Sequence, residues 1–165
     1  MNQITEPVSC ISLLQPWATL LVHGIKRNET RSRPTSFRGR LYIHASKGYD
    51  RAGEKLWNTP EIQSNRYARV WDAPFELLPR GQIIGYVNII SCMLLTDLTV
   101  LPGEMFSTLE ILCGDYKPGR FAYIATCHTP ILPIEAKGQL GIWRYDPNAP
   151  ILAPKLVPFG PSVKK

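Results

Sequence analysis

A short segment near the N-terminus, residues 16–23, constrains the fold more than any other feature, because it is apolar on almost every side. It reads PWATLLVH, and Trp17, Leu20 and Leu21 share one face at helical spacing. Proline suits the first position of a helix, so the pattern predicts a helix that begins at Pro16. A helix with so little polar surface has to be buried. The residues that follow it are therefore held by a rigid element.

Those residues form a charged stretch, GIKRNETR, over 24–31. Lys26, Glu29 and Arg31 have two interpretations: an ordinary surface ion-pair cluster, worth about 0–1 kcal/mol per pair, or a functional site. The surroundings favour a site, because the same third of the chain is basic and carries few acidic residues. The polar, basic and aromatic residues concerned are Gln15, Trp17, Arg33, Arg38, Arg40, His44 and Lys47.

The composition indicates one basic globular domain. The chain has 165 residues, of which 44% are hydrophobic and 19% are charged, with a formal net charge of +6. A basic domain suits a polyanionic partner, most often nucleic acid. No apolar run approaches the roughly 20 residues that cross a bilayer, and the N-terminus does not resemble a secretory signal. We expect a cytoplasmic protein with no membrane association.

The four cysteines give no indication of a metal site. Cys10, Cys92, Cys113 and Cys127 are isolated from one another, with no Cys-x-x-Cys pair and no histidine at zinc-finger spacing. Each lies among apolar residues, as small buried hydrophobic residues do. We therefore expect free cysteines in a reducing compartment, no metal and no cofactor.

The rest of the chain alternates short strand patterns with few helices. Residues 38–46 show the clearest strand, with Leu41 and Ile43 on one face and Tyr42 and His44 on the other. The other expected strands are 8–13, 82–91, 120–126 and 131–136, with a closing segment at 137–144. Helical patterns cover residues 50–72, split near Pro60, and a short segment within 106–112. Gly85 inside a strand indicates a bend or bulge, a device used where sheets curl.

These patterns predict an α+β fold: a small curled β-barrel of about five to six strands with flanking helices. Residues 1–146 form the domain. Residues 147–165 form a proline-rich tail, which is either disordered or extended along the body of the domain. Its apolar residues favour docking, and they are also the only sequence support for a protein-interaction module.

Three segments of the chain resemble the ASCH (activating signal cointegrator homology) domain family, within the PUA-like barrels. The first runs from LQPWA at 14–18 into GIKRNETR at 24–31, which is similar to the family's G-x-K-x-x-E-x-R signature. The second is RGRLYIHASK at 38–47. The third combines GDY at 114–116 with GRFAY at 119–123 and KGQLGIW at 137–143. Together they cover about residues 8–145.

The resemblance implies a PUA-like barrel with a cleft beside the helix that ends at Gly24, lined by the signature residues. It also implies an association with nucleic acid. The related YTH and EVE domains hold a modified base in the corresponding cleft. Some small bacterial members look like enzymes, one branch being an amidohydrolase that acts on acylated cytidine and another a ribonuclease.

If the protein binds RNA, another single-stranded nucleic acid or a nucleoside-like small molecule, seven residues have expected roles. Basic side chains would neutralise phosphates, which makes binding salt-dependent. Trp17 or Tyr42 could stack on an unpaired base, although core packing is the alternative for Trp17. Glu29 could accept a hydrogen bond from a base or orient Arg31, and His44 is either a ligand contact or a structural histidine. The full set of candidate residues is Trp17, Lys26, Glu29, Arg31, Arg33, His44 and Lys47.

Two hydrolase alternatives remain open. In a ribonuclease, Lys26 would stabilise the developing phosphorane, with Glu29 or His44 as general acid or base. In the amidohydrolase branch the lysine is matched by Lys26, but the nucleophilic threonine falls where this chain has Glu29. Thr30 is adjacent, and a shift of one residue on a strand turns the side chain to the other face.

Overall fold

The computed structural model describes residues 4–69, 73–96 and 106–149, with the side chains of 66–69 excepted. Within these residues the strands are β1 Val8–Leu13, β2 Asn28–Arg31, β3 Gly39–Ala45, β4 Gln82–Leu94, β5 Phe121–Glu135 and β6 Ile142–Tyr145. The helices are α1 Trp17–Val22, α2 Arg51–Trp57, α3 Pro60–Arg69 and α4 Thr108–Leu112, with a 3₁₀ turn η1 at Phe75–Leu77.

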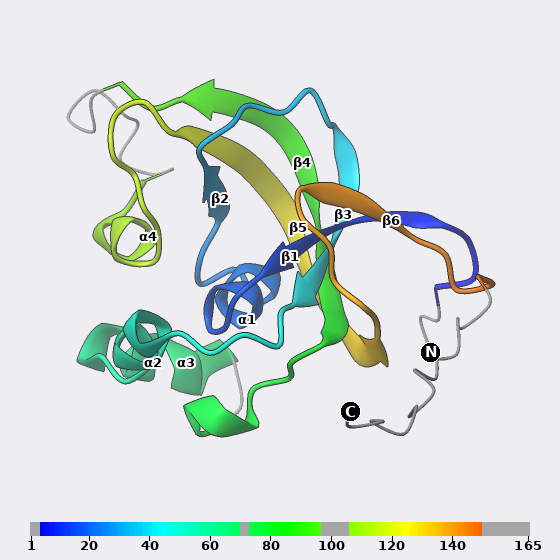
Figure 1. Ribbon diagram of the computed structural model, residues 1–165. Helices are drawn as coiled ribbons and strands as arrows, with labels where there is room; N and C mark the ends of the chain where they lie inside the picture. Colours follow the sequence, from blue (N-terminus) through cyan, green and yellow to red (C-terminus); the bar gives the residue numbers. More distant parts are fainter. Residues whose placement is uncertain (1–3, 70–72, 97–105, 150–165) are drawn as a thin grey trace, which may run out of the picture.

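All six of these strands form one sheet, in the order β2-β5-β4-β3-β1-β6. β1 pairs with β3 in parallel, and every other pair is antiparallel. The sheet curls strongly, and α1 lies in its concavity (Figure 1). β2 and β6 are its two edges, so the sheet is a curled half-barrel. The predicted α+β fold with about five to six curled strands is confirmed.

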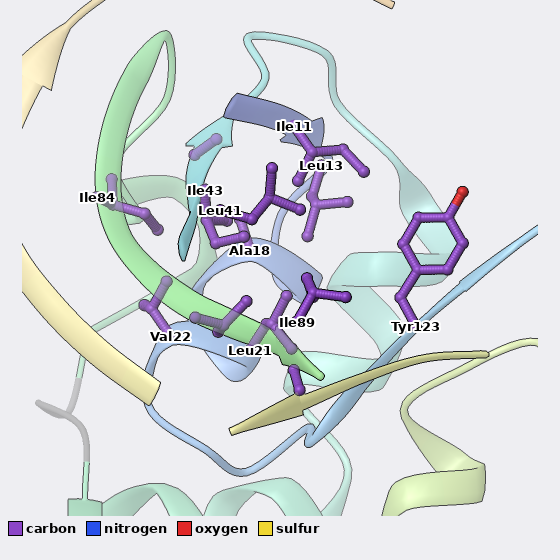
Figure 2. Close-up of a cluster of buried hydrophobic side chains, with 13 residues drawn as sticks. Ile11, Leu13, Ala18, Leu21, Val22, Leu41, Ile43, Ile84, Ile89 and Tyr123 are labelled. Carbon is purple, nitrogen blue, oxygen red and sulfur yellow. The ribbon is translucent and has the colours of Figure 1, made fainter. Parts of the chain in front are cut away.

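The main core fills the space between α1 and the concave face of the sheet. Figure 2 shows side chains from β1, β3, β4 and α1 pointing into a common interior. Leu41 and Ile43 of β3 are 2% and 0% exposed, and they meet Leu21 and Val22 of α1. The period-2 pattern of β3 thus sets which face is buried, and the apolar α1 is enclosed as its sequence requires.

The curl depends on irregular pairing between the two long strands, β4 and β5. Their register shifts at three places, one of them next to Gly85. A Cβ atom at Gly85 would lie 2.6 Å from the carbonyl oxygen of Thr129 and 2.6 Å from Cγ1 of Val22. The glycine therefore lets α1 and β5 approach β4 closely. The register shift beside it is the irregularity that a glycine inside a strand predicted.

Three features of the chain differ from the sequence-based expectation. Pro16 is the N-cap of α1, and the helix itself begins at Trp17. The two strands expected at 120–126 and 131–136 are one continuous strand, β5. The charged signature contains a strand of its own, β2.

Other expectations have mixed outcomes. The helical pattern at 50–72 does divide, into α2 and a helix that begins at Pro60. Cys10 and Cys113 are buried as expected, but Cys127 is exposed, so the expectation is wrong for that residue. Most of the proline-rich tail, from residue 150 onward, lies outside the described residues. Among the described helices, none has the length and apolar character needed to span a membrane.

Candidate functional site

The end of α1 fixes the start of the charged stretch. The backbone N–H groups of Ile25 and Lys26 donate to the carbonyl oxygen of Leu20, at 3.0 and 3.1 Å. Gly24 has a φ of 69°, a conformation that glycine adopts without steric cost. The chain therefore reverses tightly after the helix and enters β2, where Glu29 pairs with Tyr123 of β5.

A buried carboxylate from a distant helix fixes the first residues of this strand. Glu110 of α4 is 1% exposed. Its carboxylate accepts hydrogen bonds from the backbone N–H groups of Arg27 and Asn28, the latter at 2.9 Å, and from the hydroxyl of Tyr116. Burial and the neighbouring Glu110 raise the pKa of Tyr116, so its hydroxyl keeps its proton and remains a donor. Glu110 thus holds the strand that carries the signature.

The three signature side chains form one connected cluster. The Lys26 ammonium lies 3.3 Å from one carboxylate oxygen of Glu29, and the Arg31 Nε atom lies 3.0 Å from the other. Lys26 Nζ also donates to the carbonyl oxygen of Asn28. The side chains of Lys26 and Glu29 are 1% and 11% exposed. A pair this buried differs from a solvated surface ion pair, because water screens it far less.

Arg31 connects this cluster to the other side of the half-barrel. Its Nη2 atom donates to the carbonyl oxygen of Ser12 on β1, at 3.0 Å. β1 and β2 are not neighbours in the sheet, so the guanidinium bridges two strands that the curl brings near each other. The cluster is thereby tied to both sides of the opening between them.

A pocket of about 430 Å³ lies at this opening. Its lining combines a charged part with an apolar part. The charged residues are Lys26, Glu29, Arg31 and Asp115; the apolar ones are Leu13, Leu14, Trp17 and Leu112; Ser12, Thr30, Ser46 and Gly114 complete the lining. The volume lies within the usual range for small-molecule sites, which combine apolar walls with converging polar groups.

The structure brings four of the seven predicted site residues together. Trp17, Lys26, Glu29 and Arg31 all line the pocket, whereas Arg33, Lys47 and His44 do not. Arg33 and Lys47 are exposed side chains elsewhere on the surface.

His44 of β3 is 2% exposed. It lies in a hydrogen-bonded network with Ser12 of β1, Trp143 of β6 and the Ala136 carbonyl. Its Nε2 atom lies 3.1 Å from the carbonyl oxygen of Ala136, so Nε2 carries the proton that is donated there. Nδ1 then accepts from the hydroxyl of Ser12 at 3.2 Å, and that hydroxyl accepts from Nε1 of Trp143 at 3.1 Å. Burial lowers the pKa of His44, which favours this neutral arrangement. The structural interpretation of His44 accounts for all of these contacts.

Several lining residues were not predicted from the sequence. Leu112 is the last residue of α4, and Asp115 lies just after it. Both line the pocket, and both are more than 80 positions after the signature. The GDY motif at 114–116, part of the family resemblance, is the sequence signal for this part of the lining. Thr30 also lines the pocket, and its Oγ1 atom accepts a hydrogen bond from the backbone N–H of Asp115 at 3.3 Å. In the part of the chain that the structure describes, no three His, Cys, Asp or Glu side chains are grouped as a metal site.

The fold and the site together define a class: a curled β half-barrel whose buried helix delivers a Lys-Glu-Arg cluster to a pocket. The family model of the ASCH domain matches residues 11–125. The chain belongs to the ASCH domain family, as its three motifs indicated.

Two curated relatives carry the name activating signal cointegrator 1, one from Mus musculus and one from Homo sapiens. Each is 32% identical to this chain over 142 residues, which is 83% of the chain and 22% of the relative. The chain therefore spans about a fifth of the length of these relatives. Among solved structures, it is similar to the ASCH protein of Zymomonas mobilis, with a TM-score of 0.46, 20% identity, and coverage of 77% of this chain and 72% of that one.

Proposed function

We propose that this protein binds single-stranded RNA or a nucleoside-like ligand in the pocket beside α1. The observation that carries the proposal is the buried Lys26–Glu29–Arg31 cluster on one wall, with Trp17 and leucines on another. Such a pocket offers both hydrogen-bond donors and hydrogen-bond acceptors next to an apolar surface. A nucleobase has the matching features, a polar edge and two apolar faces. The family's general association with RNA supports the same proposal.

The donors and acceptors are suited to a base edge. Lys26 has three N–H donors, and Asn28 and Glu29 account for two of them, which leaves one for a ligand oxygen. Each Glu29 oxygen has a second lone pair that can accept from an exocyclic amino group. Because the cluster is held rigidly by β2, little ordering is needed when the ligand enters.

The balance of charges favours a base over a phosphate inside the pocket. Lys26 and Arg31 are offset by Glu29 and Asp115, so the lining has no formal net charge. A phosphate would gain little net attraction there, because Lys26 and Arg31 are already paired with Glu29. We expect the sugar–phosphate chain to run outside, towards exposed cations such as Arg33 and Lys47, with a salt dependence that reflects counterion release.

Substitution of the pocket cations tests the proposal. We expect Lys26→Met and Arg31→Gln each to weaken binding of a labelled single-stranded RNA about tenfold at low salt, as measured by fluorescence anisotropy. The matched control is Lys55→Met, which removes an exposed cation from α2. Circular dichroism establishes that each variant is folded. Wild-type affinity in both folded pocket variants would refute the proposal.

The same samples separate binding from hydrolysis. The Lys26–Glu29 pair lines the pocket, which is the arrangement that a ribonuclease of the kind outlined above needs, with Glu29 as general acid or base. Incubation with labelled RNA and with an N4-acylated cytidine would reveal either hydrolase activity. Turnover by the wild type that disappears in Lys26→Met would make the protein an enzyme, and binding without turnover would make it a recognition domain.

A further inference from the structure

The convex face of the sheet carries a second group of residues suited to nucleic acid, away from the pocket. It consists of Arg40 and Tyr42 on β3 and Tyr86 on β4, and is called here the tyrosine patch. Tyr42 and Tyr86 are directly opposite each other in the antiparallel pair. Their strand neighbours Leu41 and Val87 point to the other face, into the main core beneath α1. The tyrosine patch therefore lies on the face of the sheet opposite α1.

The three side chains form an ordered unit. The rings of Tyr42 and Tyr86 have centroids 5.4 Å apart at an interplanar angle of 53°. The guanidinium carbon of Arg40 lies 4.4 Å from the centroid of the Tyr86 ring, and the Arg40 guanidinium also hydrogen-bonds to Tyr42. Both tyrosines are half-buried and Arg40 is exposed. The arginine is thus held against an aromatic ring rather than extended into water.

Among the described residues, no carboxylate forms an ion pair with Arg40. The side chains that raise its pKa are Tyr42, Tyr86 and Cys127, none of which is a carboxylic acid. A guanidinium that is already ordered and not neutralised can meet an anion at little entropic cost.

We propose that the tyrosine patch is a second contact for single-stranded nucleic acid, outside the pocket. An unpaired base stacks on the guanidinium–tyrosine pair, since bases stack on both aromatic rings and arginine planes. The N–H groups at the edge of the guanidinium then face the phosphate chain. A duplex hides its base faces, so the patch selects single strands. This contact goes beyond the proposed pocket and shares no residue with it.

The test compares four variants of the full chain for binding of a single-stranded RNA decamer, its DNA counterpart and the RNA duplex. We expect Arg40→Gln and Tyr86→Leu each to lower affinity for the single strand about tenfold. Arg40→Gln should also reduce the slope of log affinity against log salt by about 0.7, because one phosphate contact is lost. Arg40→Lys should keep the slope and still lose affinity, since lysine retains the charge without the planar stack. Arg51→Gln, which removes an exposed arginine from α2, should bind as the wild type does.

Several results would overturn the proposal. They are wild-type affinity in folded Arg40→Gln and Tyr86→Leu, an equal loss in Arg51→Gln, full recovery in Arg40→Lys, or duplex binding as tight as single-strand binding. A single nucleoside separates this contact from the pocket. Binding of cytidine should weaken in Lys26→Met and stay unchanged in Arg40→Gln, so either contact can fail without the other. The relative affinities for the RNA and DNA decamers decide which single strand the patch prefers.

Discussion

Nζ of Lys26 lies 3.3 Å from the Glu29 carboxylate, and the lysine side chain is only 1% exposed. The two groups stabilise each other in a place where neither is well hydrated. Removing one partner from a buried pair costs about 3–5 kcal/mol, because the remaining charge is left without compensation. This relationship makes the signature a structural element as well as a candidate site.

A double-mutant cycle should reveal this coupling. We expect Glu29→Gln to lower the free energy of unfolding by about 3 kcal/mol, since the charges of Lys26 and Arg31 then have no carboxylate to compensate them. In a Lys26→Met background the same change should cost at least 1 kcal/mol less. Urea denaturation of the four proteins measures the difference. Additive costs would show that the two side chains are not energetically paired.

Glu110 should be essential for the start of β2, although it does not line the pocket. Replacing it by glutamine puts an NH₂ group where a carboxylate oxygen accepts from backbone N–H groups. Losing a charge-assisted hydrogen bond and leaving a buried donor unpaired costs about 3 kcal/mol. Tyr116→Phe is the milder comparison, because Glu110 keeps its backbone donors and only about 1 kcal/mol is lost.

Hydrogen exchange localises this effect. The amides of Arg27 and Asn28 should exchange much faster in Glu110→Gln than in the wild type. The exchange rates of the β3 amides should change only as much as the global free energy of unfolding requires. Equal exchange of the Asn28 amide in both proteins would contradict the role assigned to Glu110.

The stability of the protein should fall as the pH drops below about 6.5. Burial lowers the pKa of both His44 and His128, so the folded protein resists protonation while the unfolded chain binds protons near its normal pKa of about 6.5. The unfolded state then holds more protons, and the free energy of unfolding decreases with falling pH. Each histidine contributes up to about 1.4 kcal/mol per pH unit.

His44→Asn should flatten this dependence without abolishing it, because His128 remains. Chemical denaturation at pH 7.5 and pH 5.5 gives the two free energies for each protein. A wild-type protein equally stable at both values would show that the two imidazoles do not oppose protonation.

Much of the fold could be predicted from local patterns. The alternation in β3 and the apolar character of α1 each determine a buried face, and both are where the sequence placed them. β2 was missed because Asn28–Arg31 has no alternating apolar pattern. Its conformation comes from pairing with β5 and from Glu110, which is 82 positions away from Asn28.

The length of β5 was underestimated for a different reason. The sequence patterns divided this region into strands at 120–126 and 131–136, but Pro130 and Pro133 lie within one continuous strand, although proline cannot donate to a sheet ladder. β2 pairs with β5 only as far as Ile124. Beyond that point no strand of the described residues pairs with this edge of β5, so a missing N–H group there breaks no ladder hydrogen bond. The prolines are therefore tolerated within a continuous strand.

The site shows what sequence spacing can and cannot reveal. Spacing identified Lys26, Glu29 and Arg31 as one cluster, because they are close along the chain. The sequence also grouped His44 with these three residues, because alternation along β3 puts His44 on the polar face of the strand. That face is covered at this end: Trp143 packs edge-on against the His44 ring at 5.7 Å, and a Cβ at Gly138 would lie 2.4 Å from it. Alternation assigns a residue to a face, but it does not show what covers that face.

Gly85 gives a final prediction about the curl of the sheet. Its missing Cβ would meet two groups that have little room to move: the Thr129 backbone carbonyl and the side chain of Val22, at 2.6 Å each. We expect Gly85→Ala to lower the free energy of unfolding by about 1–3 kcal/mol through overpacking. The matched control is Gly48→Ala, whose Cβ would meet only the flexible Cδ2 of Leu14 at 2.9 Å. That change should cost less than about 1 kcal/mol, because the leucine end can rotate away. Urea denaturation of both variants measures the two costs. Equal costs would mean that α1 and β5 can move apart freely at Gly85, and that the close approach of these elements does not hold α1 in the concavity of the sheet.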